Sequence, residues 1–106
     1  MTIPESIKIG GFDWNIKRDI NVTSEGNVFG SAHYKSQSIF IEPEPFCTKQ
    51  KAEQCLLHET IHAIFWQTGL NQRINNINKD LEEEIVSALA HGLYQVLKDN
   101  KLSFGD

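Results

Sequence analysis

The segment 58–62 reads His-Glu-Thr-Ile-His, and these residue types at this spacing could bind a metal ion and use it. On an α-helix, residues i and i+4 lie one turn apart on the same face, so the imidazoles of His58 and His62 could reach one ion. Imidazole is a common ligand of Zn²⁺, and a catalytic zinc site combines three protein ligands with a water molecule. Glu59 could accept a proton from that water and deliver it to a leaving amine. The motif therefore predicts a zinc-dependent peptidase.

The alternative is a chance pattern on an ordinary solvated helix. Apolar residues flank the motif on both sides: Leu56, Leu57, Ala63, Ile64 and Phe65. Such flanks are typical of a buried helix, where three ionisable groups cost free energy unless they are paired or bound. The surroundings therefore favour a metal site.

A third ligand is expected from the helix that follows, which opens with three glutamates in succession. At about 100° per residue, Glu82 falls near the centre of that helix's apolar stripe, Glu83 on its flank and Glu84 well outside. Helix geometry alone does not decide whether Glu82 or Glu83 is the third metal ligand. A capping box with Asp80 is a competing interpretation of Glu83, and acidic residues at a helix start also interact favourably with the helix dipole.

With a glutamate-bearing helix shortly after the zinc motif, the sequence resembles the glutamate zincins. Among them it resembles the very short phage and prophage metallopeptidases related to the ImmA/IrrE family. The resemblance covers most of the chain, although only the zinc motif is sharply specific. It implies a zincin-like domain in which His58, His62 and Glu83 hold Zn²⁺ and Glu59 is the general base. It also implies an intracellular target, such as a repressor or another regulatory protein.

The second helix departs from the pattern of these relatives at one informative position. When Glu83 is placed on the family's glutamate, Val86 replaces a small residue and Ser87 replaces an asparagine or aspartate. The family's residue is expected to orient a ligating histidine by a hydrogen bond, which serine would make less well. This departure leaves room for a rival function, a non-catalytic zinc-binding or protein-interaction module that retains the zincin fold.

Several further residues could contribute to the site. The oxyanion formed on an attacked carbonyl needs a hydrogen-bond donor, and His33, His91 and Tyr94 are the candidates. Cys55 lies one turn before His58, and we expect it to be a small buried residue rather than a ligand. Cys47 has no partner at metal-binding spacing.

Length and composition are those of a single globular domain spanning residues 1–106. Hydrophobic residues make up 40% of the chain and charged residues 23%, and the formal net charge is −4. An acidic chain lacks the overall basic surface that is typical of nucleic-acid binding, so we expect no nucleic-acid partner. The zinc motif instead implies a peptide or protein substrate. No secretory signal or membrane-spanning run is visible, and two cysteines are too few for a disulfide scaffold. These features predict a cytoplasmic protein.

The first half of the chain is expected to form strands. Alternation over residues 12–17, after Ile7 and Ile9, predicts a strand or a hairpin that turns at Gly10-Gly11. Residues 28–34 and 38–41 predict a further hairpin. Prolines at positions 43 and 45 end strand pairing. An exposed edge at 38–41 could bind an extended peptide by strand addition.

The second half is expected to be helical. Thr48 is a predicted N-cap and Gly69 a predicted C-terminal stop, followed by a polar, loop-like segment 69–79. A second helix over about 80–99 carries a predicted buried stripe: Leu81, Ile85, Leu89, Leu93 and Val96. Gly92 within it is interpreted as a point of close approach to a neighbouring element. The expected architecture is α+β, with both helices on one face of a small antiparallel sheet.

Overall fold

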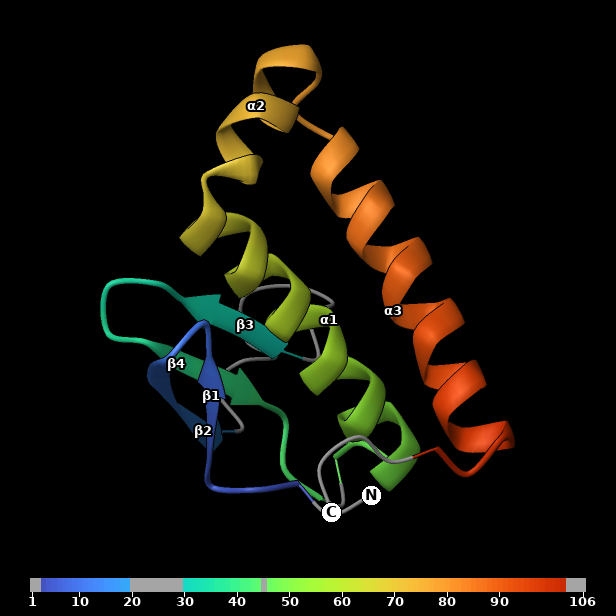
Figure 1. The fold of residues 1–106 in the computed structure, drawn as a ribbon. Helices are drawn as coiled ribbons and strands as arrows, with labels where there is room; N and C mark the ends of the chain where they lie inside the picture. The colour runs from blue at the N-terminus through green and yellow to red at the C-terminus, as the bar shows by residue number, and fades with distance from the viewer. Residues whose placement is uncertain (1–2, 20–29, 45, 103–106) are drawn as a thin grey trace.

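The computed structural model describes residues 3–19, 30–44 and 46–102, and it has the predicted α+β architecture (Figure 1). The described elements follow in the order β1 (Ser6–Ile9), β2 (Phe12–Arg18), β3 (Gly30–His33), β4 (Ser38–Ile41), α1 (Lys49–Thr68), α2 (Leu70–Ile77) and α3 (Leu81–Asp99). The segment around Gly10 and Gly11 forms a hairpin, one of its two predicted alternatives, and the second predicted hairpin is also present. Residues 28 and 29 of the predicted third strand lie outside the described residues.

The four strands form one sheet in the order β1-β2-β4-β3. Strands β1 and β2 are antiparallel and turn at Gly10 and Gly11, whose φ angles of 57° and 87° require residues that tolerate the left-handed region. Strands β3 and β4 are also antiparallel, but β2 pairs with β4 in parallel. The sheet is therefore mixed, and the prediction of a purely antiparallel sheet is wrong. Local turn signals identify each hairpin, but they do not indicate which strand of one hairpin pairs with which strand of the other.

The order of strands also corrects the predicted peptide-binding edge. Ser38–Ile41 forms β4, which pairs with β2 on one side and with β3 on the other, so it offers no free edge. Within the described ranges, β3 is the outer strand at that end of the sheet.

Helix α1 packs against one face of the sheet, and the main core lies between them. Trp14, Ile39 and Ile41 from the sheet are fully buried against α1 residues that include Ala52 and Ala63. Trp14 is anchored by its Nε1, which donates a 2.7 Å hydrogen bond to Gln67 Oε1 on α1. The sheet therefore holds the helix that carries the His-Glu-x-x-His motif.

The ends of α1 are those expected from the sequence. Thr48 Oγ1 accepts a hydrogen bond from the backbone N–H of Lys51, and Gly69 has a left-handed φ of 77°. The segment after Gly69 was predicted to be a loop, but it forms α2. Its apolar residues Leu70, Ile74 and Ile77 recur at helical spacing among asparagines, and Ile74 is buried with α1 and α3. Tertiary packing here outweighs the weak helix propensity of asparagine.

Helix α3 has close neighbours only in α1 and α2 among the described elements, so the prediction that it packs on the sheet beside α1 is wrong. Val86 and Ala90 are buried, while Leu81 and Ile85 are partly buried. The predicted buried stripe is wrong over its second half, because Leu89, Leu93 and Val96 are 43%, 44% and 41% exposed. The helix packs through the adjacent positions 86 and 90. None of the described helices is both long and apolar enough to span a bilayer.

Gly30 provides a test of the close contact between β3 and α1. A Cβ atom at Gly30 would collide with Cys55 Sγ and would lie 2.8 Å from the backbone oxygen of Phe40. We expect Gly30→Ala to lower the free energy of unfolding by about 1–3 kcal/mol, measured by urea denaturation. Cys55→Ala in the same chain should restore part of this loss, since it removes one of the two collisions. Unchanged stability of the single variant would contradict the contact.

Candidate metal centre

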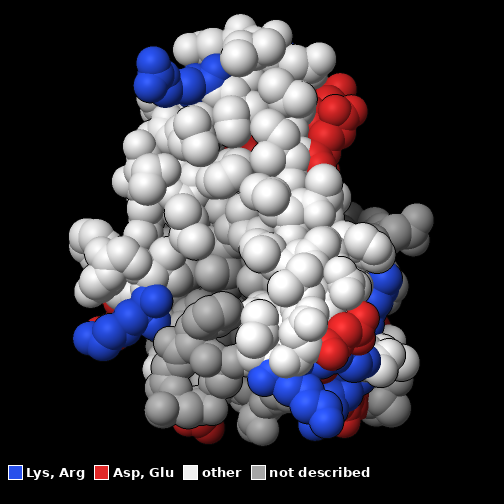
Figure 2. All heavy atoms as spheres, turned by 45° about the vertical axis from the view of Figure 1, so that its right-hand side comes forward, with Lys and Arg blue, Asp and Glu red and all other residues white. Residues whose placement is uncertain are grey.

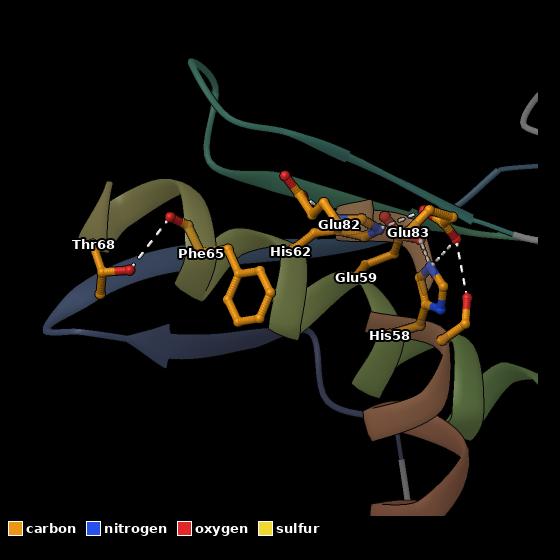
Figure 3. A network of polar contacts seen from close by, with 8 residues as sticks. His58, Glu59, His62, Phe65, Thr68, Glu82 and Glu83 are labelled. Atoms are coloured by element: carbon orange, nitrogen blue, oxygen red, sulfur yellow. Dashed lines mark hydrogen bonds and ion pairs between the residues drawn. The ribbon is translucent and has the colours of Figure 1, made fainter. Parts of the chain in front are cut away.

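The two histidines of the motif lie one turn apart on α1 and face α3. Their ring centroids are 5.0 Å apart, and both residues are partly buried. Figure 3 shows both rings directed toward Glu83, which comes from the first turn of α3. The structure therefore brings together the predicted histidines and one of the candidate glutamates.

Glu83 bridges the two imidazoles. Its Oε1 lies 2.9 Å from His58 Nε2, and its Oε2 lies 2.9 Å from His62 Nε2. One donor atom from each of the three residues falls within 4.8 Å of the others. A tetrahedral zinc ion with bonds of about 2.1 Å separates its ligand atoms by about 3.4 Å. Two imidazole nitrogens and a carboxylate at this spacing fit such an ion after small side-chain adjustments.

Glu82 takes a different place from Glu83. Its Oε2 lies 2.6 Å from His62 Nδ1, the ring nitrogen that faces away from Glu83, and both side chains are 12% exposed. Because a carboxylate accepts, His62 must donate at Nδ1. This is the arrangement by which carboxylates orient the histidine ligands of metal sites.

The capping-box interpretation of Glu83 is not supported. Asp80 makes no capping hydrogen bond through its side chain, and the carboxylate oxygens of Glu83 are directed to the histidines. Ser87 Oγ donates a 3.3 Å hydrogen bond to Glu83 Oε1. The serine that departs from the zincin pattern thus contacts the candidate ligand itself, while Glu82 contacts the histidine.

Both carboxylate contacts of His62 need a hydrogen-bond donor. Both ring nitrogens lie within 2.9 Å of a carboxylate oxygen, and neither oxygen can donate while its group is ionised. Without a metal ion, each of these contacts needs a hydrogen between the nitrogen and the oxygen. A divalent cation between His58, His62 and Glu83 would replace the hydrogen between His62 and Glu83 and satisfy the same groups.

Burial tunes the ionisation of the neighbouring groups. Burial, with a smaller contribution from His62, lowers the pKa of His58 although Glu83 opposes the shift. A lowered pKa favours the neutral imidazole of His58, the form that binds metals. Burial also raises the pKa of Glu59 to about 7, and this residue is only 8% exposed. A carboxylate with a pKa near 7 suits a general base working at neutral pH.

A cavity of about 410 Å³ opens beside the cluster. Its walls include His58, Glu59 and Glu83 together with Gly30 of β3 and His91 of α3. Gly30 brings the backbone of the outer strand close to Glu59, since a Cβ there would lie 3.6 Å from Glu59 Cγ. The base candidate therefore stands between the helix that carries it and the outer strand of the sheet.

The structure separates the three candidate oxyanion donors. His91 lines the cavity, with Nδ1 3.5 Å from Gln54 Nε2. Tyr94 instead donates a 3.0 Å hydrogen bond to Glu53. His33 packs its ring on Phe40, on the sheet face opposite α1. Of the three, His91 alone borders the cavity.

Tyr34 is a neighbour of the site that the sequence did not indicate. Its ring stacks on Trp66 at 5.2 Å between centroids. Burial, followed by the charges of Glu82, Glu59 and Glu83, raises the pKa of Tyr34 to about 12. The phenol is thus protonated at neutral pH and lies within the field of the acidic cluster. No spacing relates this turn residue to the motif on α1, so only the fold reveals its position.

Cys55 borders the same cavity without joining the cluster. Burial and then the charge of Glu59 raise the pKa of its thiol to about 12. A neutral thiol is a poor zinc ligand. Cys47 is buried and donates a hydrogen bond to the backbone oxygen of Glu42. Both cysteines are free.

Compared with protein-family models, with curated proteins and with solved structures, the chain gives no match.

In the metal-free protein, the burial of Glu59 should make the free energy of unfolding depend on pH. The pKa of Glu59 rises from 4.5 to about 7 on folding, so wild-type stability should fall as pH rises through this window. Glu59→Gln cannot ionise. In chelator-treated protein we expect its stability relative to wild type to increase by about 1–3 kcal/mol between pH about 5 and about 8, measured by urea denaturation. The exposed Glu84→Gln is the matched control. A parallel pH dependence in Glu59→Gln and wild type would refute the assignment.

Proposed function

We propose that this chain is a zinc-dependent peptidase of the glutamate-zincin type. The observation that carries the proposal is the convergence of His58 Nε2, His62 Nε2 and the Glu83 carboxylate beside the buried Glu59. Two imidazoles and one carboxylate are a known ligand set of catalytic zinc, which keeps a fourth position open. The open cavity on the same side of the cluster supports a role in catalysis over a closed structural site.

Each residue of the cluster has a distinct task in the proposed reaction. When bound, Zn²⁺ would polarise the scissile carbonyl and increase the acidity of a water molecule. Glu59 accepts a proton from the attacking water and delivers it to the leaving amine. Glu82 holds the ring of His62 through Nδ1, and Ser87 holds Glu83. His91 and Tyr34 are the candidates to donate a hydrogen bond to the oxyanion.

The proposed substrate is an extended peptide paired with β3. This strand is the outermost one at its end of the described sheet, and Gly30 places its backbone next to Glu59. A peptide added to a sheet edge gains main-chain hydrogen bonds, and alternate side chains point toward and away from the helix below. An intracellular regulatory protein would fit an enzyme whose cysteines are both free thiols.

Metal affinity should distinguish the roles of the adjacent glutamates. We expect His58→Ala, His62→Ala and Glu83→Gln to lose zinc, because each removes a ligand. Glu82→Gln should retain zinc with an affinity about 10–100-fold lower, because only the orientation of His62 is affected. Glu84→Gln, on the same turn, is the control and should bind as wild type. Competition with a chromophoric chelator gives the affinities. Loss of zinc in Glu82→Gln with retention in Glu83→Gln would reverse the assignment.

Catalysis is tested separately at Glu59, which is not among the proposed ligands. We expect Glu59→Gln to bind zinc stoichiometrically and to cleave peptides at least about 100-fold more slowly than wild type, measured on a mixed peptide library by mass spectrometry. Glu84→Gln should cleave as wild type. Zinc-loaded wild-type protein that cleaves no peptide would instead support a non-catalytic zinc-binding module.

A further inference from the structure

One face of α3 is apolar and without a partner among the described residues. Leu89, Leu93 and Val96 are each more than 40% exposed, and no residue from 85 to 97 is an acid, a lysine or an arginine. Figure 2, which turns α3 toward the viewer, shows uncharged side chains across the middle of this face and charged groups toward its edges. A broad apolar area of this kind is unusual on the surface of a monomer.

The residues on this face follow the spacing of a helix–helix seam. Ile85, Leu89, Gly92 and Val96 recur at intervals of four, three and four, which places them in one row along the helix. Ile85 is partly buried, and Val86 and Ala90, which pack in the core cluster shared with α1 and α2, lie to one side of this row. The row is therefore a second packing surface of the same helix.

Gly92 has no role within one chain that the described structure reveals. Glycine in a helix interior costs about 1 kcal/mol relative to alanine, yet a Cβ atom at Gly92 would meet nothing within 4 Å. A glycine on an exposed apolar row does allow the backbone of another helix to approach closely. The expected close approach at Gly92 is thus absent among the described residues of one chain and available to a second molecule.

We propose that this face pairs two copies of the chain, with the α3 helices antiparallel about a two-fold axis. In that arrangement Leu89 of each copy packs over Gly92 of the other, and Ile85 packs against Val96. The same row of residues on both copies therefore forms matching contacts, as a two-fold interface requires.

The charges at the ends of α3 favour the antiparallel arrangement. Its first turn carries Glu82, Glu83 and Glu84, whereas its last turn carries Lys98 beside Asp99, and Lys101 follows. Antiparallel pairing places the acidic end of one helix near the more basic end of the other, while parallel pairing would bring the two acidic ends together. Helix dipoles have the same preference. The acidic and the more basic end of α3 therefore complement those of a second, antiparallel copy.

Oligomeric state tests the proposal directly. We expect wild-type protein to be a dimer that dissociates on dilution, measured by sedimentation equilibrium over a wide range of concentrations. Leu89→Glu should raise the dissociation constant at least tenfold, because each copy would place a carboxylate in the apolar seam. The control is Ile77→Glu on α2, where the residue is 78% exposed and lies off the row. It should dimerise as wild type.

The variant Gly92→Gln separates weaker dimerisation from a loss of folding. Glutamine is a good helix former and has open space in one chain, so the thermal stability of the monomer should rise while dimerisation weakens. A wild-type monomer at every concentration would overturn the proposal and leave the face to a different partner. Dimerisation of Leu89→Glu or Gly92→Gln with wild-type affinity would overturn it equally. None of these residues belongs to the histidine cluster, so zinc content should be unchanged in all variants.

Discussion

The contact between Glu83 and the two histidines depends on how α3 is held against α1, because the carboxylate stands on one helix and both imidazoles on the other. Val86 and Ala90 fix the rotation of α3, since they are buried in the cluster shared with α1 and α2. Glu83 precedes them by three and seven residues and therefore lies on the same side of the helix. A rotation by one residue, about 100°, would turn it away from the histidines.

The sequence was most informative where a signal is local. The i, i+4 histidines, the cap at Thr48 and the stop at Gly69 need only one helix, and each lies where it was predicted. The sequence could not decide between Glu82 and Glu83 as the third metal ligand, and the reason is physical. The apolar stripe suggested a buried face centred near Leu89, whereas α3 packs through positions 86 and 90. Side-chain hydrophobicity alone does not show which of two apolar faces is covered.

Features that depend on pairing between distant segments could not be predicted from the sequence. The parallel contact between β2 and β4 joins segments separated by the whole third strand, and it moves the outer edge of the sheet from β4 to β3. The same contact brings Gly30 to Glu59 and places Tyr34 in the field of the acidic cluster. The two hairpins could be predicted separately, but the surface they offer to a peptide is a property of their union.

The acidic cluster and the open face of α3 are linked through that helix. Glu82, Glu83 and Glu59 concentrate negative charge around two histidines, so the side chains alone repel one another unless protons or a cation compensate them. The packing of α3 must oppose this repulsion, and it does so from one side only. A second copy on the opposite face would hold the helix from both sides.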